Sequence, residues 1–257
     1  MKTHLRTLGG RPWRVAFAAA LDLLLPPGCT FCHQDLERVT DDIHLCGDCR
    51  EALVNLSGPV CLLCGCELPA SFTRDQQGCS NCSKLGYQFS AVMALSAYRM
   101  KTRIAMLQTK RPGGQPLATA LGGLLAHCQG GQIRQFQPHR VVPIPMHWMR
   151  RLQRGSNCPD TVAGTVADKL ELPFTPHLLV RRRKTIRQTE LTQGRRLENV
   201  RHVFSVHRPR KVENKRILLV DDIMTTGATC NEAAKALRAA GAADIAVAVL
   251  ARANPWV

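Results

Sequence analysis

The chain has 257 residues, of which 45% are hydrophobic and 21% are charged. This composition excludes a disordered chain, a collagen-like fibre and a bundle of membrane helices, and the length suffices for one large domain or two small ones. Lys and Arg number 35 against 19 Asp and Glu, and the formal charge of +16 indicates a polyanionic partner such as nucleic acid, phosphorylated small molecules or an anionic membrane surface.

Charge and cysteine are distributed unevenly along the chain. Residues 1–90 carry 8 basic and 9 acidic side chains, which leaves 27 basic and 10 acidic side chains, net +17, in residues 91–257. Nine of the 12 cysteines lie between positions 29 and 82. We therefore expect three segments: an N-terminal helix over residues 1–25, a small cysteine-rich domain over residues 26–90, and a larger basic domain over residues 91–257.

The N-terminal segment contains an apolar run, Val15 to Leu25, that follows several basic residues in the manner of a secretory signal. Asp22 interrupts the run, two prolines follow it, and at 11 residues it is shorter than the about 20 that span a bilayer. Apolar residues at helical spacing favour an amphipathic helix packed on its own domain. No other segment is long enough to cross a membrane, so we expect a cytoplasmic protein without a membrane span.

The cysteine-rich segment contains four Cys-x-x-Cys pairs, with 13 residues between the first two pairs and 14 between the last two. Tetrahedral zinc takes four ligands, and each such pair delivers two sulfurs from one turn. The spacing predicts two structural zinc sites, a double zinc ribbon. The predicted ligands are Cys29, Cys32, Cys46 and Cys49 in the first site and Cys61, Cys64, Cys79 and Cys82 in the second.

Disulfide bridges are the first alternative for these cysteines, and they would require export, which the N-terminal segment does not favour. A redox relay is the second, and it would require a thioredoxin-like strand and helix around the motif. Cys66 lies two residues after Cys64 and could replace it as a ligand; the sequence leaves that choice open. The segment is slightly acidic and has few aromatic residues, so nucleic-acid binding by the ribbons is a minor alternative.

From residue 91 the sequence alternates apolar runs with helical stretches, which predicts an α/β domain with a mostly parallel sheet. In such sheets the ligand site lies at the carboxyl ends of the strands. The predicted strands are Ala91–Tyr98, Arg140–Ile144, Leu178–Val180, Arg216–Asp221 and Ile245–Leu250, and the predicted helices are Lys101–Gln108, Gln115–Gln129, Pro159–Glu171 and Ala228–Ala240.

One strand end carries a chemically specific motif over residues 217–229. Four apolar residues precede Asp221 and Asp222, and a turn rich in Thr and Gly then opens a helix. Backbone N–H groups at a helix N-terminus form an anion pocket, and a plain helix cap would need only one such residue. A phosphate in this pocket would place polyol hydroxyls against the two carboxylates. The predicted phosphate-binding residues are Thr225, Thr226, Gly227, Ala228 and Thr229.

The 13-residue segment Ile217–Thr229 resembles the phosphoribosyl-pyrophosphate motif of type I phosphoribosyltransferases. The whole chain resembles the ComF/GntX family, in which a zinc-binding segment precedes such a domain. The blocks that carry the resemblance are LLLPPGCTFC, Tyr98 with Lys110, VVPIPMHWMRRLQRGSN, the residues Arg183, Thr185, Gln188, Leu191, Arg196, Asn199 and Phe204, and VDDIMTTGAT. The family motif RGFNQ reads here as RGSNC, with Ser156 and Cys158 at the two departures.

The resemblance implies a type I phosphoribosyltransferase-like domain over residues 91–257, in which the turn of Thr and Gly holds the 5′-phosphate and Asp221 and Asp222 meet the ribose hydroxyls. It also implies Mg²⁺ bridging ribose and pyrophosphate, Arg154 among the catalytic residues, and a flexible loop that closes over the site. The residues that it implies for the loop and the pyrophosphate are Arg183, Gln188, Arg196 and Asn157.

Residues 181–216 hold 13 basic and 3 acidic side chains and correspond to that loop region. A cationic lid would stabilise a departing pyrophosphate, whereas a solvated loop or a nucleic-acid groove would give the same charge. We therefore hold two hypotheses. The first is a Mg²⁺-dependent phosphoribosyltransferase-like protein that binds phosphoribosyl pyrophosphate. The second is a non-catalytic DNA-uptake or DNA-utilisation factor that binds single-stranded DNA, with other DNA-uptake proteins as partners that the resemblance implies.

Overall fold

A computed structural model describes residues 27–36, 42–56, 58–68, 78–80, 82–83, 85–146, 158–181 and 203–254. The predicted helix over residues 1–25 lies outside these ranges. In chain order the elements are α2 (Gly47–Leu53), β1 (Ala91–Ala97), α3 (Met100–Gln108), α4 (Gln115–Phe136), β2 (Arg140–Pro143), α6 (Cys158–Lys169), β3 (Leu179–Arg181), β4 (Phe204–Val206), the 3-10 turn η2 (Pro209–Lys211), β5 (Arg216–Met224), α8 (Ala228–Ala239) and β6 (Asp244–Arg252).

The centre of the molecule is a four-stranded parallel sheet with strand order β1-β6-β5-β2. Strands β3 and β4 form a separate antiparallel pair. The predicted α/β class with a mostly parallel sheet is therefore confirmed. Because all four strands run the same way, their carboxyl ends meet at one edge of the sheet, where β5 continues into the turn before α8.

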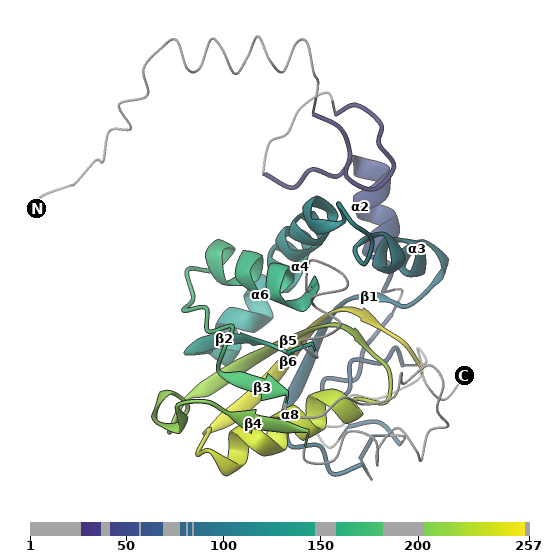
Figure 1. Ribbon diagram of the computed structural model, residues 1–257. Helices are drawn as coiled ribbons and strands as arrows, with labels where there is room; N and C mark the ends of the chain where they lie inside the picture. Colours follow the sequence, from purple (N-terminus) through teal and green to yellow (C-terminus); the bar gives the residue numbers. More distant parts are fainter. Residues whose placement is uncertain are drawn as a thin grey trace, which may run out of the picture.

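The sheet is covered on both faces, which is why its strands read as nearly continuous apolar runs. Successive side chains of a strand point to opposite faces. Leu218 and Val220 of β5 thus pack in one core with α4 and α6, whereas Ile217 and Leu219 pack in the other with α8 and the β3–β4 pair (Figure 1).

The cysteine-rich segment packs on this domain at two places. Helix α2 lies against α3 (Figure 1), and Leu45 and Leu53 are buried in the same core as the leucines of α4. Farther along, the backbone N–H of Val92 in β1 donates to the carbonyl of Leu62, 2.9 Å away. Both parts of the cysteine-rich segment therefore contact the α/β domain.

The basic run over residues 181–216 is only partly described. Residues 207–215 precede β5 and lie at the amino ends of the parallel strands, where Arg140 Nε donates to the carbonyl of Lys211 at 2.9 Å. Asp222 is six residues beyond Arg216 along β5, which is about 20 Å in an extended strand. This part of the positive charge therefore forms no lid over the carboxyl end of β5.

Candidate functional site

The two cysteine groups have the geometry of four-thiolate metal sites. In each group the four sulfurs lie within 4.8 Å of one another, and the members are those that the spacing predicts. We call Cys29, Cys32, Cys46 and Cys49 the first cysteine cluster and Cys61, Cys64, Cys79 and Cys82 the second cysteine cluster.

The distances between the sulfur atoms show whether the clusters fit zinc ligation or disulfide bonds. Cys61 and Cys82 lie 3.6 Å apart, Cys64 and Cys79 lie 3.7 Å apart, and Cys32 and Cys46 lie 3.7 Å apart. A tetrahedron with zinc–sulfur bonds of about 2.3 Å has sulfur–sulfur edges of about 3.8 Å, whereas a disulfide bond is about 2.05 Å long. The observed distances match zinc ligation and are too long for disulfides.

All four cysteines of the second cluster are buried. Burial raises the free-energy cost of ionising their thiols when no cation is bound. Burial and the hydrogen bond to Cys79 raise the pKa of Cys82 to about 12. A divalent cation replaces those protons and turns its binding free energy into folding free energy. Cys66 is buried beside this cluster without belonging to it, so the geometry selects Cys64 as the ligand.

The acidic pair lies near the carboxyl end of β5, which runs three residues farther than predicted, to Met224. Asp221 faces α8, and the Sγ of Cys230 donates to its Oδ2 at 3.9 Å. The Nζ of Lys110 lies 2.8 Å from the Oδ2 of Asp222. The two acidic side chains interact with each other, and Asp222 also has a cationic partner.

The electrostatics of the pair follow from this arrangement. Burial and then the charge of Asp222 raise the pKa of Asp221 well above its usual range. Burial disfavours the charged form of Lys110, but the charge of Asp222 and the hydrogen bond to it outweigh burial and raise the pKa of Lys110. The site therefore keeps one cation aimed at Asp222 and one carboxyl group that ionises with difficulty.

Residues 225–229, here called the β5–α8 turn, join the strand to the helix. Gly227 precedes the first residue of α8 with φ of +77°, a left-handed conformation that favours glycine. A Cβ at this position would lie 3.1 Å from the ring of Tyr87. The Thr226 hydroxyl accepts from the N–H of Ala228 at 3.4 Å. This is the sharp strand-to-helix turn that the motif predicts.

The turn is held from behind by residues that the sequence alone did not single out. Tyr87 Oη donates to the carbonyl of Thr226 at 2.7 Å, and the N–H of Gln88 donates to Asn231 Oδ1 at 2.7 Å. The guanidinium of Arg252, at the end of β6, donates to the carbonyls of Met224 and Thr225. An arginine that follows the apolar run of β6 directly is the one sequence signal that could have drawn attention to this contact.

The structure brings together part of the predicted site. Asp221, Asp222 and Thr225–Thr229 lie within one strand end and its turn, and Lys110 reaches them from the segment between α3 and α4. The remaining predicted residues lie outside the described residues, so their positions stay predictions: Arg154, Asn157, Arg183, Gln188 and Arg196.

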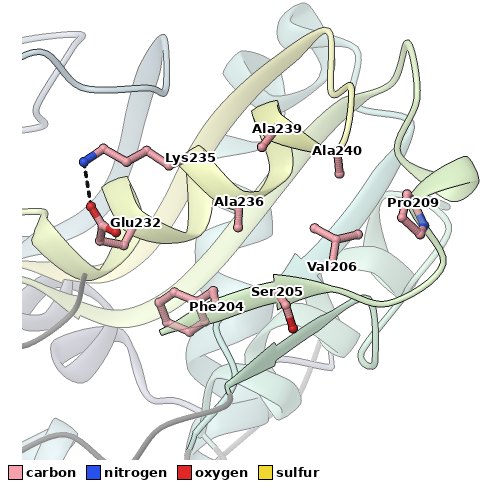
Figure 2. Close-up of a pocket in the computed structure, with 9 residues that line it drawn as sticks. All are labelled: Phe204, Ser205, Val206, Pro209, Glu232, Lys235, Ala236, Ala239 and Ala240. Atoms are coloured by element: carbon pink, nitrogen blue, oxygen red, sulfur yellow. Dashed lines mark hydrogen bonds and ion pairs between the residues drawn. The ribbon is translucent and has the colours of Figure 1, made fainter. Parts of the chain in front are cut away.

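The groove between β4 and α8 is a separate feature, with a volume of about 690 Å³ (Figure 2). Its α8 side is lined by residues from Glu232 onward, beyond the first turn of the helix, and it includes neither acid of β5. The lining residues are Phe204, Ser205, Val206, Pro209, Glu232, Lys235, Ala236, Ala239 and Ala240.

Two family models match separate parts of the chain. A family model described as a double zinc ribbon domain matches residues 20–83, and one described as a phosphoribosyl transferase domain matches residues 161–255. Competence protein F of Haemophilus influenzae is 28% identical over 88% of this chain and 96% of its own length. The DNA utilization protein YhgH of Escherichia coli O157:H7 is 26% identical over 90% of this chain and 99% of its own.

The predicted resemblance to the ComF/GntX family is confirmed. Competence protein ComFC of Streptococcus pneumoniae is likewise 26% identical over 87% of this chain and 99% of its own. Zinc ribbons and a phosphoribosyltransferase-type fold therefore occur here in the order that the ComF/GntX resemblance implies. Across the ranges that the structure describes, no helix combines the length and the apolar character needed to span a bilayer.

Proposed function

We propose that this protein binds phosphoribosyl pyrophosphate together with Mg²⁺ at the carboxyl end of β5 and that it serves the uptake or use of DNA. The observation that carries the proposal is the strand-to-helix turn at Gly227, which follows the acidic pair directly. A helix N-terminus with a left-handed glycine before it binds a phosphate through backbone N–H groups. The names of the competence and DNA-utilisation relatives support the process.

Each part of the site has a role in this proposal. The β5–α8 turn binds the 5′-phosphate, and Asp221 and Asp222 accept hydrogen bonds from the ribose hydroxyls. The ammonium group of Lys110 orients Asp222 and offsets part of the charge repulsion between the acids and an anionic ligand. Bound Mg²⁺ would neutralise pyrophosphate oxygens, and the carboxylates with the ribose hydroxyls offer the hard oxygen ligands that it prefers.

In a transfer reaction these residues would act by position and charge. The protein would fix the ribose so that an acceptor attacks the anomeric carbon as pyrophosphate leaves, and it would stabilise the developing positive charge on the ring through Asp221 and Asp222. No covalent bond to a protein nucleophile is required. Arg154 stays a proposed catalytic residue. The proposed residues of the loop and the pyrophosphate are Arg183, Gln188, Arg196 and Asn157.

Calorimetry tests this function directly. Wild-type protein titrated with phosphoribosyl pyrophosphate and Mg²⁺ should release binding heat, and the double variant Asp221→Ala/Asp222→Ala should release none. Asp168→Ala is the matched control, because Asp168 is an exposed acid on α6. Equal binding by the double variant and the control, or no heat with the wild type, would refute the proposed function.

The second candidate function is binding of single-stranded DNA, and the basic surface at the amino edge of the sheet favours it. Arg208, Arg210 and Lys211 are exposed there, and no ion pair joins them to an acid within the described ranges. Unpaired surface cations release counterions from nucleic-acid phosphates on binding. This surface lies at the opposite edge from Asp221, so both functions can operate in one molecule.

Salt dependence tests the DNA candidate. We expect the double variant Arg208→Gln/Arg210→Gln to lower the slope of log affinity against log salt by about 1.4, at about 0.7 for each lost phosphate contact to a single strand. The charge-matched control is Lys101→Gln/Arg103→Gln on α3. An unchanged slope in the first double variant, or an equal change in both, would contradict binding at the amino edge.

A further inference from the structure

The second cysteine cluster contacts Tyr87, which follows its last cysteine by five residues, and Arg252, which lies in the phosphoribosyltransferase-type domain. Tyr87 packs against the buried cysteines and is itself half-buried. Arg252 is 3% exposed, and its Nε donates to the carbonyl of Cys64 at 2.5 Å. A carbonyl of one of the predicted zinc ligands thus anchors a buried guanidinium at the end of β6.

The same two side chains hold the β5–α8 turn. Arg252 Nη1 donates to the carbonyl of Met224 at 3.0 Å and also to that of Thr225, and Tyr87 Oη donates to the carbonyl of Thr226 at 2.7 Å. Three consecutive carbonyls are therefore fixed on the side that faces Tyr87 and Arg252.

The directions of these carbonyls determine the directions of the N–H groups in the same peptide units. In a trans peptide the C=O and the following N–H point in opposite directions, and the described chain has no cis peptide bond. The carbonyls of Met224, Thr225 and Thr226 point toward Tyr87 and Arg252. The N–H groups of the same peptide units, those of Thr225, Thr226 and Gly227, therefore point away from these two side chains. This is the side from which an anion would bind.

We propose that Tyr87 and Arg252 are positioning residues that aim the N–H groups of the β5–α8 turn at the 5′-phosphate, and that zinc in the second cysteine cluster raises the affinity for that phosphate through them. The proposal rests on the proposed function for its ligand. The sulfur–sulfur distances in the cluster match those expected around zinc. The role of the zinc is to fix the backbone at Cys64, whose carbonyl accepts the hydrogen bond from Arg252.

Thermodynamic linkage gives the coupling a second, reciprocal consequence. If zinc in the second cysteine cluster raises the affinity for the phosphate, the phosphate must raise the affinity for that zinc by the same factor. The two clusters are distinguishable in a chelator titration, because Cys32 of the first is exposed whereas all four cysteines of the second are buried. The zinc retained at the higher chelator concentration is assigned to the second cluster.

The experiment uses the full chain and conservative variants. Tyr87→Phe removes only the hydroxyl, and Arg252→Lys keeps the charge but loses the several directed N–H donors of the guanidinium. Arg216→Lys is the matched control, because Arg216 also donates two directed hydrogen bonds, to the carbonyl and the Oε1 of Gln137, but at the amino end of β5. Three quantities are measured: affinity for ribose 5-phosphate, amide hydrogen exchange over residues 224–231, and chelator competition for zinc.

We expect Tyr87→Phe and Arg252→Lys each to weaken ribose 5-phosphate binding by about tenfold, the effect of one lost hydrogen bond to a fixed group. Both should speed amide exchange over residues 224–231 with zinc content unchanged, and Arg216→Lys should change neither the binding nor the exchange. Ribose 5-phosphate should strengthen zinc retention by the second cysteine cluster in the wild type, and the double variant Tyr87→Phe/Arg252→Lys should lose that effect.

The outcomes separate this inference from the function on which it rests. A wild type that binds no ribose 5-phosphate refutes the phosphoribosyl function, and the exchange measurement on unliganded protein still decides the positioning role. Unchanged exchange in both variants overturns the inference, even if the wild type binds the ligand. Equal losses of affinity in Arg252→Lys and Arg216→Lys also overturn it, because they show a general effect on stability.

Discussion

Gly227→Ala tests the link between backbone conformation and phosphate binding most directly. Gly227 holds a φ of +77°, and an added Cβ would lie 2.6 Å from Met224 Cε and 3.1 Å from both Cε1 and Oη of Tyr87. The methionine methyl can move aside, since it ends a flexible side chain. The tyrosine ring has less freedom, because it stacks on Phe89 with centroids 4.5 Å apart and donates to the carbonyl of Thr226.

The magnitude follows from two contributions. A left-handed conformation costs an alanine about 1–2 kcal/mol relative to glycine. Moving the ring by a few tenths of an ångström weakens the 2.7 Å bond from Tyr87 to Thr226, which is worth about 1 kcal/mol. Together they lower the free energy of unfolding by about 2–3 kcal/mol, or the Tm by about 4–12 °C for a chain of this length.

Thermal denaturation and ribose 5-phosphate titration measure the two consequences, and Gly241→Ala serves as the control. Gly241 follows α8 with φ of +90°, and its Cβ would make only ordinary contacts, at 3.5 Å from Glu213. Gly241→Ala should lower the free energy of unfolding by about 1–2 kcal/mol and keep the affinity for ribose 5-phosphate. Gly227→Ala should lower the free energy of unfolding further and bind ribose 5-phosphate at least tenfold more weakly. Equal Tm values in the two variants, with unchanged affinity in Gly227→Ala, would refute the reasoning.

Three further changes test the acids and the cysteines. Asp221→Asn should raise the Tm without ligand or Mg²⁺, because burial and the neighbouring charge raise the pKa of Asp221 in the folded state and ionising it opposes folding. The difference in Tm between this variant and the wild type should grow as the pH rises above about 4, where the carboxyl group of Asp221 ionises in the unfolded chain. A Tm difference that is independent of pH between about 4 and 8 would contradict this. Lys110→Ala should cost about 1–3 kcal/mol in chemical denaturation, since it leaves Asp222 without its cation; an unchanged midpoint would show that the pair contributes nothing. Cys64→Ser should lose zinc from the second cysteine cluster and Cys66→Ser should retain it in metal analysis, and the reverse pattern would exchange their roles.

The fold could be predicted where a residue pattern specifies it locally. The strands of the sheet follow from apolar runs that are buried on both faces, and α8 follows from the turn before it. The elements β4 and η2 escaped prediction, because they lie within a basic segment that has no apolar run. Helix α4 was predicted to end at Gln129, before two glycines, yet it continues to Phe136 because Ile133 is buried in the core.

The site was predictable only where its residues are consecutive. The run from Asp221 to Thr229 carries its chemistry in order, so reading it required no tertiary information. Lys110 and Tyr87 lie more than a hundred residues earlier in the chain. Only the tertiary fold brings Lys110 to Asp222 and Tyr87 to the turn after β5. Tertiary contacts of this kind leave no periodic signal in a single sequence.

Packing also changes what the cysteine-rich segment contributes to the molecule. Composition changes sharply near residue 90, but the buried Cys29 and Cys49 of the first cysteine cluster share one core with Leu121 and Leu125 of α4. Zinc bound by the first cluster therefore adds folding free energy to a core that also covers the central sheet. The second cluster, by our proposal, acts through the backbone behind the β5–α8 turn. The first cluster would then stabilise the core beneath β5, and the second would set the direction of the N–H groups of the turn.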